Sequence, residues 1–195
     1  LESGQVTYRP EMTPALRRLF APRFETRGSF FEEMLGKPAG MPKIRRRQRR
    51  REAVPEHDSR LGYRLKVSLQ WNRRVWRAIE VLAGQTLEDL HLAIQEAFGW
   101  DNDHLYAFFM SGRAWDGPTE IEGPLGEAEP PTADEVALGE LGLSPGQRFL
   151  YIFDFGDDLR HQVEVLETFS PAPEGEYPRM SESHGKAPQQ YPDWD

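Results

Sequence analysis

Residues 148–169 read RFLYIFDFGDDLRHQVEVLETF, and this stretch carries the strongest fold signal in the chain. In its first half, aromatic residues recur at every second position, which is the period of a strand with one buried face. The side chains expected on that face are Phe149, Tyr151, Phe153 and Phe155. Val163 and Val165 alternate with polar residues in the second half and predict the next strand. Gly156-Asp157 between the two is typical of a hairpin turn, because glycine tolerates positive φ and aspartate can hydrogen-bond within its own turn.

Two further strand patterns and one helix pattern precede this stretch. Residues 63–69, YRLKVSL, alternate apolar and polar side chains, and residues 75–82, VWRAIEVL, are rich in β-branched and aromatic residues. A short polar link joins these two patterns, so we expect a hairpin. Residues 87–98 carry apolar side chains at helical spacing, with Thr86 as the expected N-cap and Gly99 as the expected C-cap.

The remaining patterns complete the order of elements. Residues 105–112, LYAFFMSG, predict a third strand, a loop rich in Gly, Pro and Glu follows over residues 116–132, and a short helical turn is expected over residues 133–141. This order is that of a β-grasp sheet. We therefore predict an α+β fold, a β-grasp-like mixed sheet (ββαββ plus an extra hairpin strand) with one main helix packed across it.

The chain divides into three expected parts. Residues 1–60 predict an irregular or helical N-terminal extension with a basic linker, residues 61–170 the β-grasp-like domain, and residues 171–195 an extended C-terminal tail. A length of 195 residues supports one well-buried core. The chain begins LESG without a methionine, which is typical of a fragment, a trimmed chain or a cloning scar.

Charge separates the extension from the rest. Residues 1–60 contain 14 Lys and Arg against 8 Asp and Glu, whereas residues 61–195 contain 10 against 24. The acidic part repels polyanions, so nucleic-acid contact is expected only where cations concentrate. They concentrate in one arginine-rich arm: Lys43, Arg45, Arg46, Arg47, Arg49, Arg50 and Arg51. This arm is interpreted either as a solvated tether or as a contact for phosphates.

Composition excludes several chemistries. The chain has no cysteine, and therefore no disulfide framework, thiol nucleophile or thiolate metal site. No apolar run approaches the length of a membrane span, and no signal peptide is recognisable. We expect a cytoplasmic protein without membrane contact.

The acidic residues around Gly156 raise the question of a site. Asp154 stands between Phe153 and Phe155, where a carboxylate needs solvent or a partner. A hairpin that turns at residue 157 would bring Asp154 close to His161 on the next strand. A carboxylate beside an imidazole can be a structural ion pair, a general base or a metal ligand.

A second acid and histidine group, WDNDH over residues 100–104, follows the predicted helix. His104 is expected at a strand end near the same edge of the sheet. His104, Asp154, Asp158 and His161 together are the candidate polar or metal cluster, with oxygen and nitrogen ligands that suit zinc, manganese or iron. A divalent metal is therefore one open interpretation of this cluster.

Several segments together resemble the plasmid pRiA4b ORF-3-like family over about residues 61–191. These are Trp76-Arg77, the helix pattern that runs into FGWDNDHL, and YIFDFGDDLRH. The resemblance implies a β-grasp-like domain of bacteria, archaea and mobile elements, with uncharacterised biochemical function. Carried over by position, the family pattern selects Trp76, Arg77, Trp100, His104, Asp154, Gly156, Asp157 and His161.

This chain also departs from the family pattern. Leu159 stands where the family usually has tryptophan, and residues 188–191, PQQY, stand where it usually has an acidic stretch. If those acids complete a site in relatives, the site here is weakened, or it is rebuilt by Asp193 or Asp195.

Three functions follow as hypotheses. The first is a non-catalytic interaction or accessory module that binds a protein partner. The second is a metal-dependent hydrolase-type enzyme that uses the candidate cluster. The third is a DNA-associated protein of mobile elements whose arginine-rich arm contacts phosphates.

Overall fold

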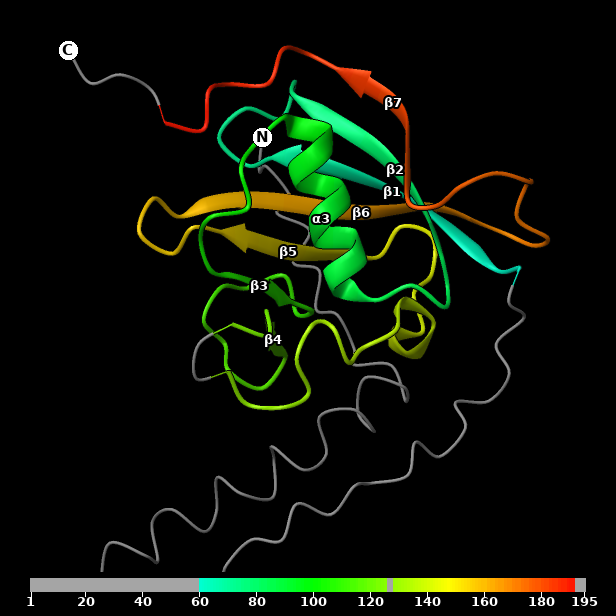
Figure 1. Cartoon of the computed structure of the whole chain (residues 1–195), viewed down its shortest axis with the longest axis horizontal. Helices are drawn as coiled ribbons and strands as arrows, with labels where there is room; N and C mark the ends of the chain where they lie inside the picture. The colour runs from blue at the N-terminus through cyan, green and yellow to red at the C-terminus, as the bar shows by residue number, and fades with distance from the viewer. Residues whose placement is uncertain (1–59, 126–127, 192–195) are drawn as a thin grey trace, which may run out of the picture.

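One antiparallel sheet organises residues 60–125 and 128–191, the part of the chain that this computed structural model describes (Figure 1). Its seven strands are ordered β4-β3-β5-β6-β1-β2-β7. In chain order the elements are β1 (Gly62–Leu69), β2 (Trp76–Leu82), α3 (Leu87–Phe98), β3 (Tyr106–Phe109), β4 (Glu120–Glu122), the 3-10 helix η1 (Leu138–Leu141), β5 (Arg148–Phe153), β6 (Leu159–Phe169) and β7 (Arg179–His184).

Strand β1 is an inner strand of this sheet, and its alternation gives it one apolar, buried face. Leu65 and Val67 are completely buried, and β1 pairs with β2 on one side and with β6 on the other. Leu65 is opposite Ile79 of β2 and Val165 of β6, so aliphatic side chains cross the sheet in a row. Burial of such side chains supplies about 1.5 to 3 kcal/mol each.

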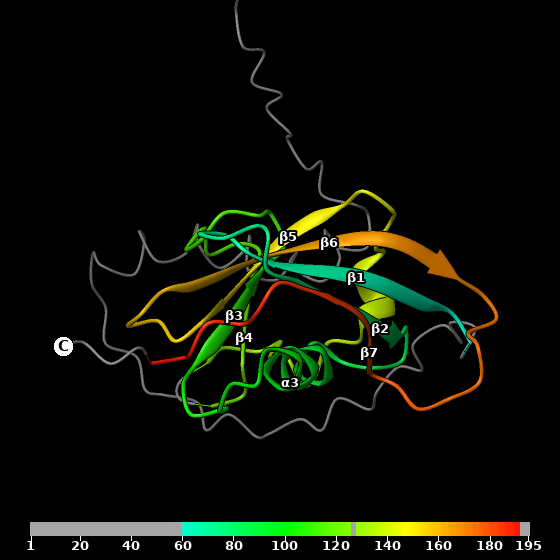
Figure 2. The ribbon, with the colours of Figure 1, turned by 90° about the horizontal axis from the view of Figure 1, so that it is seen from above.

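Helix α3 covers one face of the sheet, as Figure 2 shows from above. It begins at a capping box in which the Thr86 hydroxyl accepts from the Asp89 amide, and the Asp89 carboxylate accepts from the Thr86 amide. It ends at Gly99, whose φ of 69° is the left-handed conformation that favours glycine. The apolar helix side chains buried against the sheet are Leu87, Leu90, Ile94 and Phe98.

Arg77 on β2 joins the end of this helix to the C-terminal part of the chain. Its side chain is buried, and its N–H groups donate to the backbone carbonyl oxygens of Ala97, Trp76, His184 and Gly185 at 2.8, 2.8, 3.1 and 3.2 Å. The guanidinium also lies 4.9 Å over the Phe98 ring. Burial lowers the pKa of Arg77. The Ala97 carbonyl belongs to the last helical turn, where the helix dipole favours a cation.

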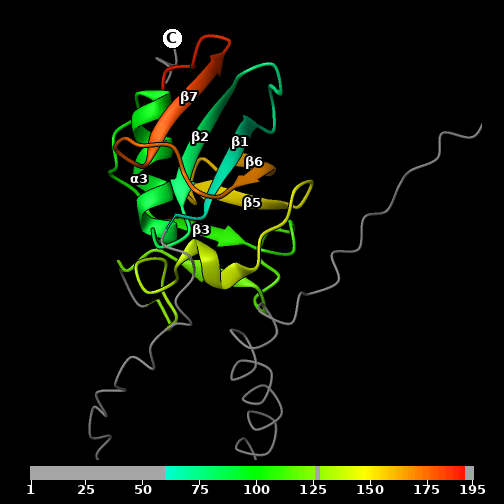
Figure 3. The same cartoon turned by 90° about the vertical axis from the view of Figure 1, so that its right-hand side faces the viewer.

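Strand β7 extends the sheet within the segment expected to be a tail. It pairs antiparallel with β2 and forms one edge of the sheet, as Figure 3 shows. Its sequence, RMSESH, has no apolar alternation, so the sequence pattern predicts no strand there. Arg179 forms an ion pair with Glu80, and Glu182 forms one with Arg64, which attaches this polar strand to the sheet through side chains.

The α+β class and the single main helix are confirmed for the described residues. The expected mixed sheet is wrong there, because every strand pairing in residues 60–125 and 128–191 is antiparallel. The loop predicted over residues 116–132 contains a short strand, β4. Among residues 60–125 and 128–191, no helix has the length and apolar character needed to cross a bilayer.

The hairpin between β5 and β6 differs from the expected two-residue turn. Phe153 is paired with Leu159, so the connection spans residues 154–158. Asp154 has a φ of 54°, which ends the strand alternation. As a result, Phe155 does not join the core under α3. It packs with Ala107, Phe109, Leu150 and Ile152, a second apolar cluster on the opposite face of the sheet.

Candidate functional site

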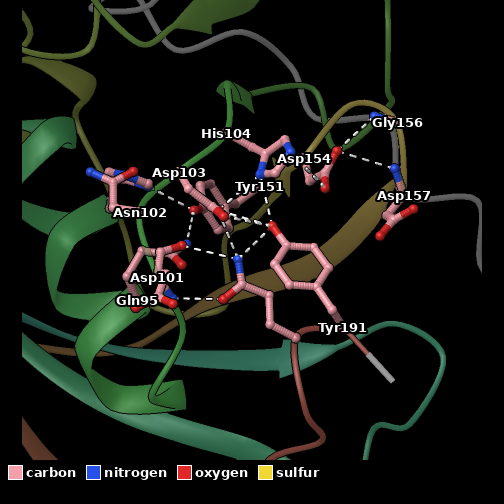
Figure 4. Close-up of polar contacts among 12 residues, drawn as sticks. Gln95, Asp101, Asn102, Asp103, His104, Tyr151, Asp154, Gly156, Asp157 and Tyr191 are labelled. Carbon is pink, nitrogen blue, oxygen red and sulfur yellow. Dashed lines mark hydrogen bonds and ion pairs between the residues drawn. The ribbon is translucent and has the colours of Figure 1, made fainter. Parts of the chain in front are cut away.

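Asp154 and His104 meet at the end of β5. The Asp154 amide donates to the Leu105 carbonyl at 2.9 Å, which holds the β5 end against the segment before β3. Asp154 is only 5% exposed, and its Oδ1 accepts from the Gly156 and Asp157 amides at 2.9 and 3.2 Å (Figure 4). Its Oδ2 lies 3.6 Å from His104 Nε2. Backbone amides therefore donate to one oxygen of this carboxylate, and an imidazole faces the other.

Asp103 holds the other nitrogen of the same imidazole. His104 Nδ1 lies 2.8 Å from Asp103 Oδ1 and 2.8 Å from the Tyr191 hydroxyl, and that hydroxyl lies 2.9 Å from Asp103 Oδ1. The hydrogen bond to Asp103, with the nearby charge of Asp154, raises the pKa of His104. The same bond lowers the pKa of Asp103. His104 is therefore placed to carry a proton between two carboxylates.

Gln190 fixes the C-terminal segment over this group. Its Oε1 accepts from the Asp101 amide at 2.6 Å, and its Nε2 donates to the Asp101 carbonyl and to Asp103 Oδ1, each at 3.0 Å. Trp100 Nε1 donates to the Pro188 carbonyl at 3.0 Å. The segment after β7 is thus attached to the loop that carries His104 at several successive points.

Of the four predicted cluster residues, the structure brings His104 and Asp154 together. Asp158 points to another partner, because Arg160 Nε donates to its Oδ1 and Oδ2 at 2.9 and 2.8 Å. His161 lies opposite Tyr151 near the start of β6 and is completely buried. The expected pairing of Asp154 with His161 is wrong, because the loop over residues 154–158 places Asp154 beyond the paired strands.

His161 belongs to an aromatic cluster at the C-terminal end of α3. Its ring centroid lies 5.3 Å from that of Phe98, 5.4 Å from that of Trp100 and 5.2 Å from that of Tyr151. Nδ1–H donates to the Leu159 carbonyl at 2.9 Å, which leaves Nε2 as an unprotonated acceptor without a partner among the described residues. Burial lowers the pKa of His161 to about 3, so the ring is neutral.

The residues selected by the family pattern therefore fall into two groups. One group surrounds the acid and histidine site: His104, Asp154, Gly156 and Asp157. The other contacts the C-terminal segment or packs around Phe98: Trp76, Arg77, Trp100 and His161. The second group builds the structure that positions the first.

Sequence reasoning missed Asp103, Gln190 and Tyr191 as members of the site. The available signal was the departure at residues 188–191, where the family usually has acids. In this chain a carboxamide and a phenol occupy that stretch and bind Asp103 and His104. Burial and the hydrogen bond to Asp103 raise the pKa of Tyr191 to about 12, so the hydroxyl stays protonated. Asp193, Asp195 and the arm over residues 43–51 lie outside the described residues, and their roles stay predictions.

This geometry limits the chemistry of His104. Both ring nitrogens face carboxylates, so no nitrogen points freely at a substrate as a general base requires. Within residues 60–125 and 128–191, no group of three or more His, Asp or Glu side chains is arranged to hold a metal ion. The arrangement suits retention of positive charge and attachment of the C-terminal segment.

The fold and the site define an antiparallel α+β domain with an acid and histidine group at the end of β5. Comparison with known proteins agrees with this class. Residues 62–191 match the model of a protein family described as "Plasmid pRiA4b ORF-3-like protein". The chain belongs to this family, which confirms the resemblance carried by Trp76-Arg77, FGWDNDHL and YIFDFGDDLRH.

Two relatives extend the comparison. "Uncharacterized protein y4hQ" of Sinorhizobium fredii (strain NBRC 101917 / NGR234) is 35% identical over 129 residues, which cover 64% of this chain and 63% of y4hQ. The match thus spans less than two thirds of that relative. The crystal structure of MM3350 from Methanosarcina mazei Go1, titled a protein of unknown function, has a TM-score of 0.54 and 28% identity, covering 67% of this chain and 72% of MM3350.

We expect acid to destabilise the fold through His161. The unfolded histidine titrates near about 6.5 and the folded one near about 3, so only the unfolded chain binds the proton between these values. The contribution of neutral His161 to the free energy of unfolding is complete above about pH 6.5 and is lost as the pH falls towards 3. Urea unfolding should give a lower free energy at about pH 5 than at about pH 7.5, and His161→Phe should reduce that drop by about 2 kcal/mol.

His184→Ala is the matched control, because His184 is exposed at the sheet edge. It should keep the wild-type dependence on pH. The assignment fails if His161→Phe shows the same drop as the wild-type chain.

Proposed function

We propose that this protein is an interaction module that binds an extended segment of a partner protein by strand addition at β7. The observation that carries the proposal is the open outer side of β7. Five of its six residues are exposed, and within the described residues it pairs only with β2. An edge strand presents unpaired N–H and C=O groups that an extended peptide can use.

The opposite edge of the sheet is a poorer template. Strand β4 has three residues, against six in β7. A bulge at Ser181 interrupts the pairing of β7 with β2, and bulges protect an edge from unspecific pairing. We place the contact along the whole of β7, with residues 182–184 as its uninterrupted part beyond this bulge.

The surroundings of β7 offer side-chain contacts to an added strand. The Trp76 and His184 rings stack at 5.7 Å, and Lys66 lies 4.7 Å over the Trp76 ring. Met180 is half exposed at the other end of β7. These groups would read the partner's side chains, while the backbone supplies affinity. We also propose a cytoplasmic location and a β-grasp relationship, the latter supported by the one helix across the sheet.

A proline scan of β7 tests strand addition. Proline has no backbone N–H. Where the replaced residue directs its N–H away from β2, proline leaves the pairing with β2 intact but blocks an added strand. Where the replaced residue donates to β2, proline destabilises the edge. Peptides are first selected from a displayed random library on the purified chain. Prolines in residues 182–184 that leave the melting temperature unchanged should weaken binding of a selected peptide by about tenfold, or about 1.4 kcal/mol.

Alternate N-methylation of the peptide backbone provides the second readout. Successive amides of an extended peptide point to opposite sides. Methylation of an amide that faces β7 should therefore abolish binding, and methylation of the next amide along the peptide should not. Equal binding by all fold-retaining prolines in β7 would rule out strand addition.

A second candidate function rests on His104 Nε2 and Asp154 Oδ2, which lie 3.6 Å apart. One divalent cation can bind two such atoms, as a metal-dependent hydrolase-type enzyme would need. Calorimetric titration with Zn²⁺ should then give about one equivalent bound by the wild-type chain. His104→Ala should lose this binding and His184→Ala should retain it. This candidate is contradicted if the wild-type chain binds no Zn²⁺. It is also contradicted if His104→Ala binds Zn²⁺ as the wild-type chain does.

A further inference from the structure

Tyr106 on β3 has a buried hydroxyl without a hydrogen-bond partner among the described residues. The side chain is 4% exposed, and its ring stacks on the His91 ring of α3 with 3.6 Å between the centroids. The end of the ring that bears the hydroxyl lies so close to Gly123 that a Cβ there would stand 2.8 Å from Tyr106 Cζ. Burial of a hydroxyl without a partner costs free energy, so its retention needs a reason.

Acidic side chains lie around this hydroxyl. Ala133 joins the segments that carry them, because its amide donates to the Glu122 carbonyl at 2.8 Å and its carbonyl accepts from the Glu88 amide at 3.1 Å. Asp134 follows Ala133 and therefore lies beside the first turn of α3. Burial, and then the negative charges of Glu88 and Asp134, raise the pKa of Tyr106, so the hydroxyl stays protonated. The hydroxyl thus lies at the base of an acidic cluster formed by Glu88 and Asp134.

No cation of the described residues balances this cluster. Neither Glu88 nor Asp134 forms an ion pair within residues 60–125 and 128–191. Burial raises the pKa of Glu88, and the charges of Asp134 and Asp89 raise it further. All three charged side chains of α3 are acidic, namely Glu88, Asp89 and Glu96. A cationic group is therefore attracted to the start of this helix.

The arginine-rich arm (residues 43–51) joins the described part of the chain close to this cluster. The Leu61 carbonyl accepts from the Ala83 amide at 2.8 Å. Five residue steps separate Ala83 from Glu88, so these two residues lie within about 17 Å of each other. Ten residue steps separate the end of the arm from Leu61, and they can span about 33 Å. The arm is therefore long enough to reach the cluster.

We propose that the arginine-rich arm docks on the acidic cluster of its own chain. An arginine of the arm pairs with the Glu88 and Asp134 carboxylates, and one N–H of its guanidinium donates to the Tyr106 oxygen. The arm holds seven cations in nine residues, which complements the negative charge at the start of α3. While it is docked, its cations face carboxylates instead of the phosphates of a nucleic acid. The contact thus regulates the arm and is separate from strand addition at β7.

A spin label on Gln48→Cys in the full chain tests this contact through paramagnetic relaxation enhancement of amide signals. The chain has no other cysteine, so the label is confined to the arm. Signals of residues 86–92 and 132–136 should broaden at low salt and recover in about 0.5 M NaCl, because salt screens exposed charges. Glu88→Gln combined with Asp134→Asn should lower the enhancement by about threefold.

Tyr106→Phe separates docking from a role in folding. It removes a hydroxyl that has no partner among the described residues, so the melting temperature should not fall. The enhancement should nevertheless decrease by about twofold, because the guanidinium loses one acceptor. An unchanged enhancement in Tyr106→Phe would remove the hydroxyl from the site and overturn the proposal.

Glu174→Gln combined with Glu176→Gln is the matched control. Both acids are exposed on a loop that also approaches the end of the arm, since the Ala172 amide donates to the Arg60 carbonyl at 2.6 Å. This control should broaden as the wild-type sequence does. The proposal is overturned if no signal of residues 86–92 broadens, or if the control loses as much enhancement as the variant of the cluster.

A mixture of two chains identifies the source of the arm. Isotope-labelled wild-type chain, which has no cysteine, is mixed with unlabelled chain that carries the spin label. Its signals should stay sharp, because each arm docks on its own chain. Broadening of residues 86–92 in this mixture would assign the cluster to the arm of a second copy and overturn docking within one chain.

Discussion

Arg77 brings a buried positive charge into contact with the end of α3, with β2 and with the segment that follows β7. A buried cation is costly unless its donors have partners, and here carbonyl oxygens, not a carboxylate, accept from Nε and Nη1. These oxygens come from separate parts of the chain, so each must lie where the guanidinium reaches it. The position of the C-terminal segment is thereby coupled to the helix and the sheet.

The site at the end of β5 depends on the same constraint. After Gly185, the chain contacts Trp100 through Pro188 and then Asp101 and Asp103 through Gln190. Tyr191 reaches His104 only because this path is fixed. The proposed contact at β7 depends on the same framework. Arg77 fixes the end of β7 at one edge of the sheet.

The sequence patterns predicted the strands and helix ends that depend only on neighbouring residues. Alternation in residues 63–69 and 149–153 gave strands, and Thr86 with Gly99 bounded the helix, because these signals need no distant partner. Phe155 was placed on the wrong face because one positive φ at Asp154 ended the alternation. The alternation that buries Val163 and Val165 also places His161 on the buried face of β6, so the burial of this residue was predictable from the sequence. Strand β7 and the contacts of Gln190 and Tyr191 depend on side chains far apart in sequence, such as Arg77 and Asp103.

Hydrogen exchange measured on Arg77→Lys tests the central claim most directly. Lysine keeps the charge, but a single ammonium cannot reach carbonyl oxygens on three parts of the chain. Exchange should become faster in the last turn of α3, in β7 and in residues 186–191, and should stay near wild-type rates in β3 and β5. Unchanged exchange in residues 179–191, or an equal increase throughout the sheet, would contradict the role assigned to Arg77.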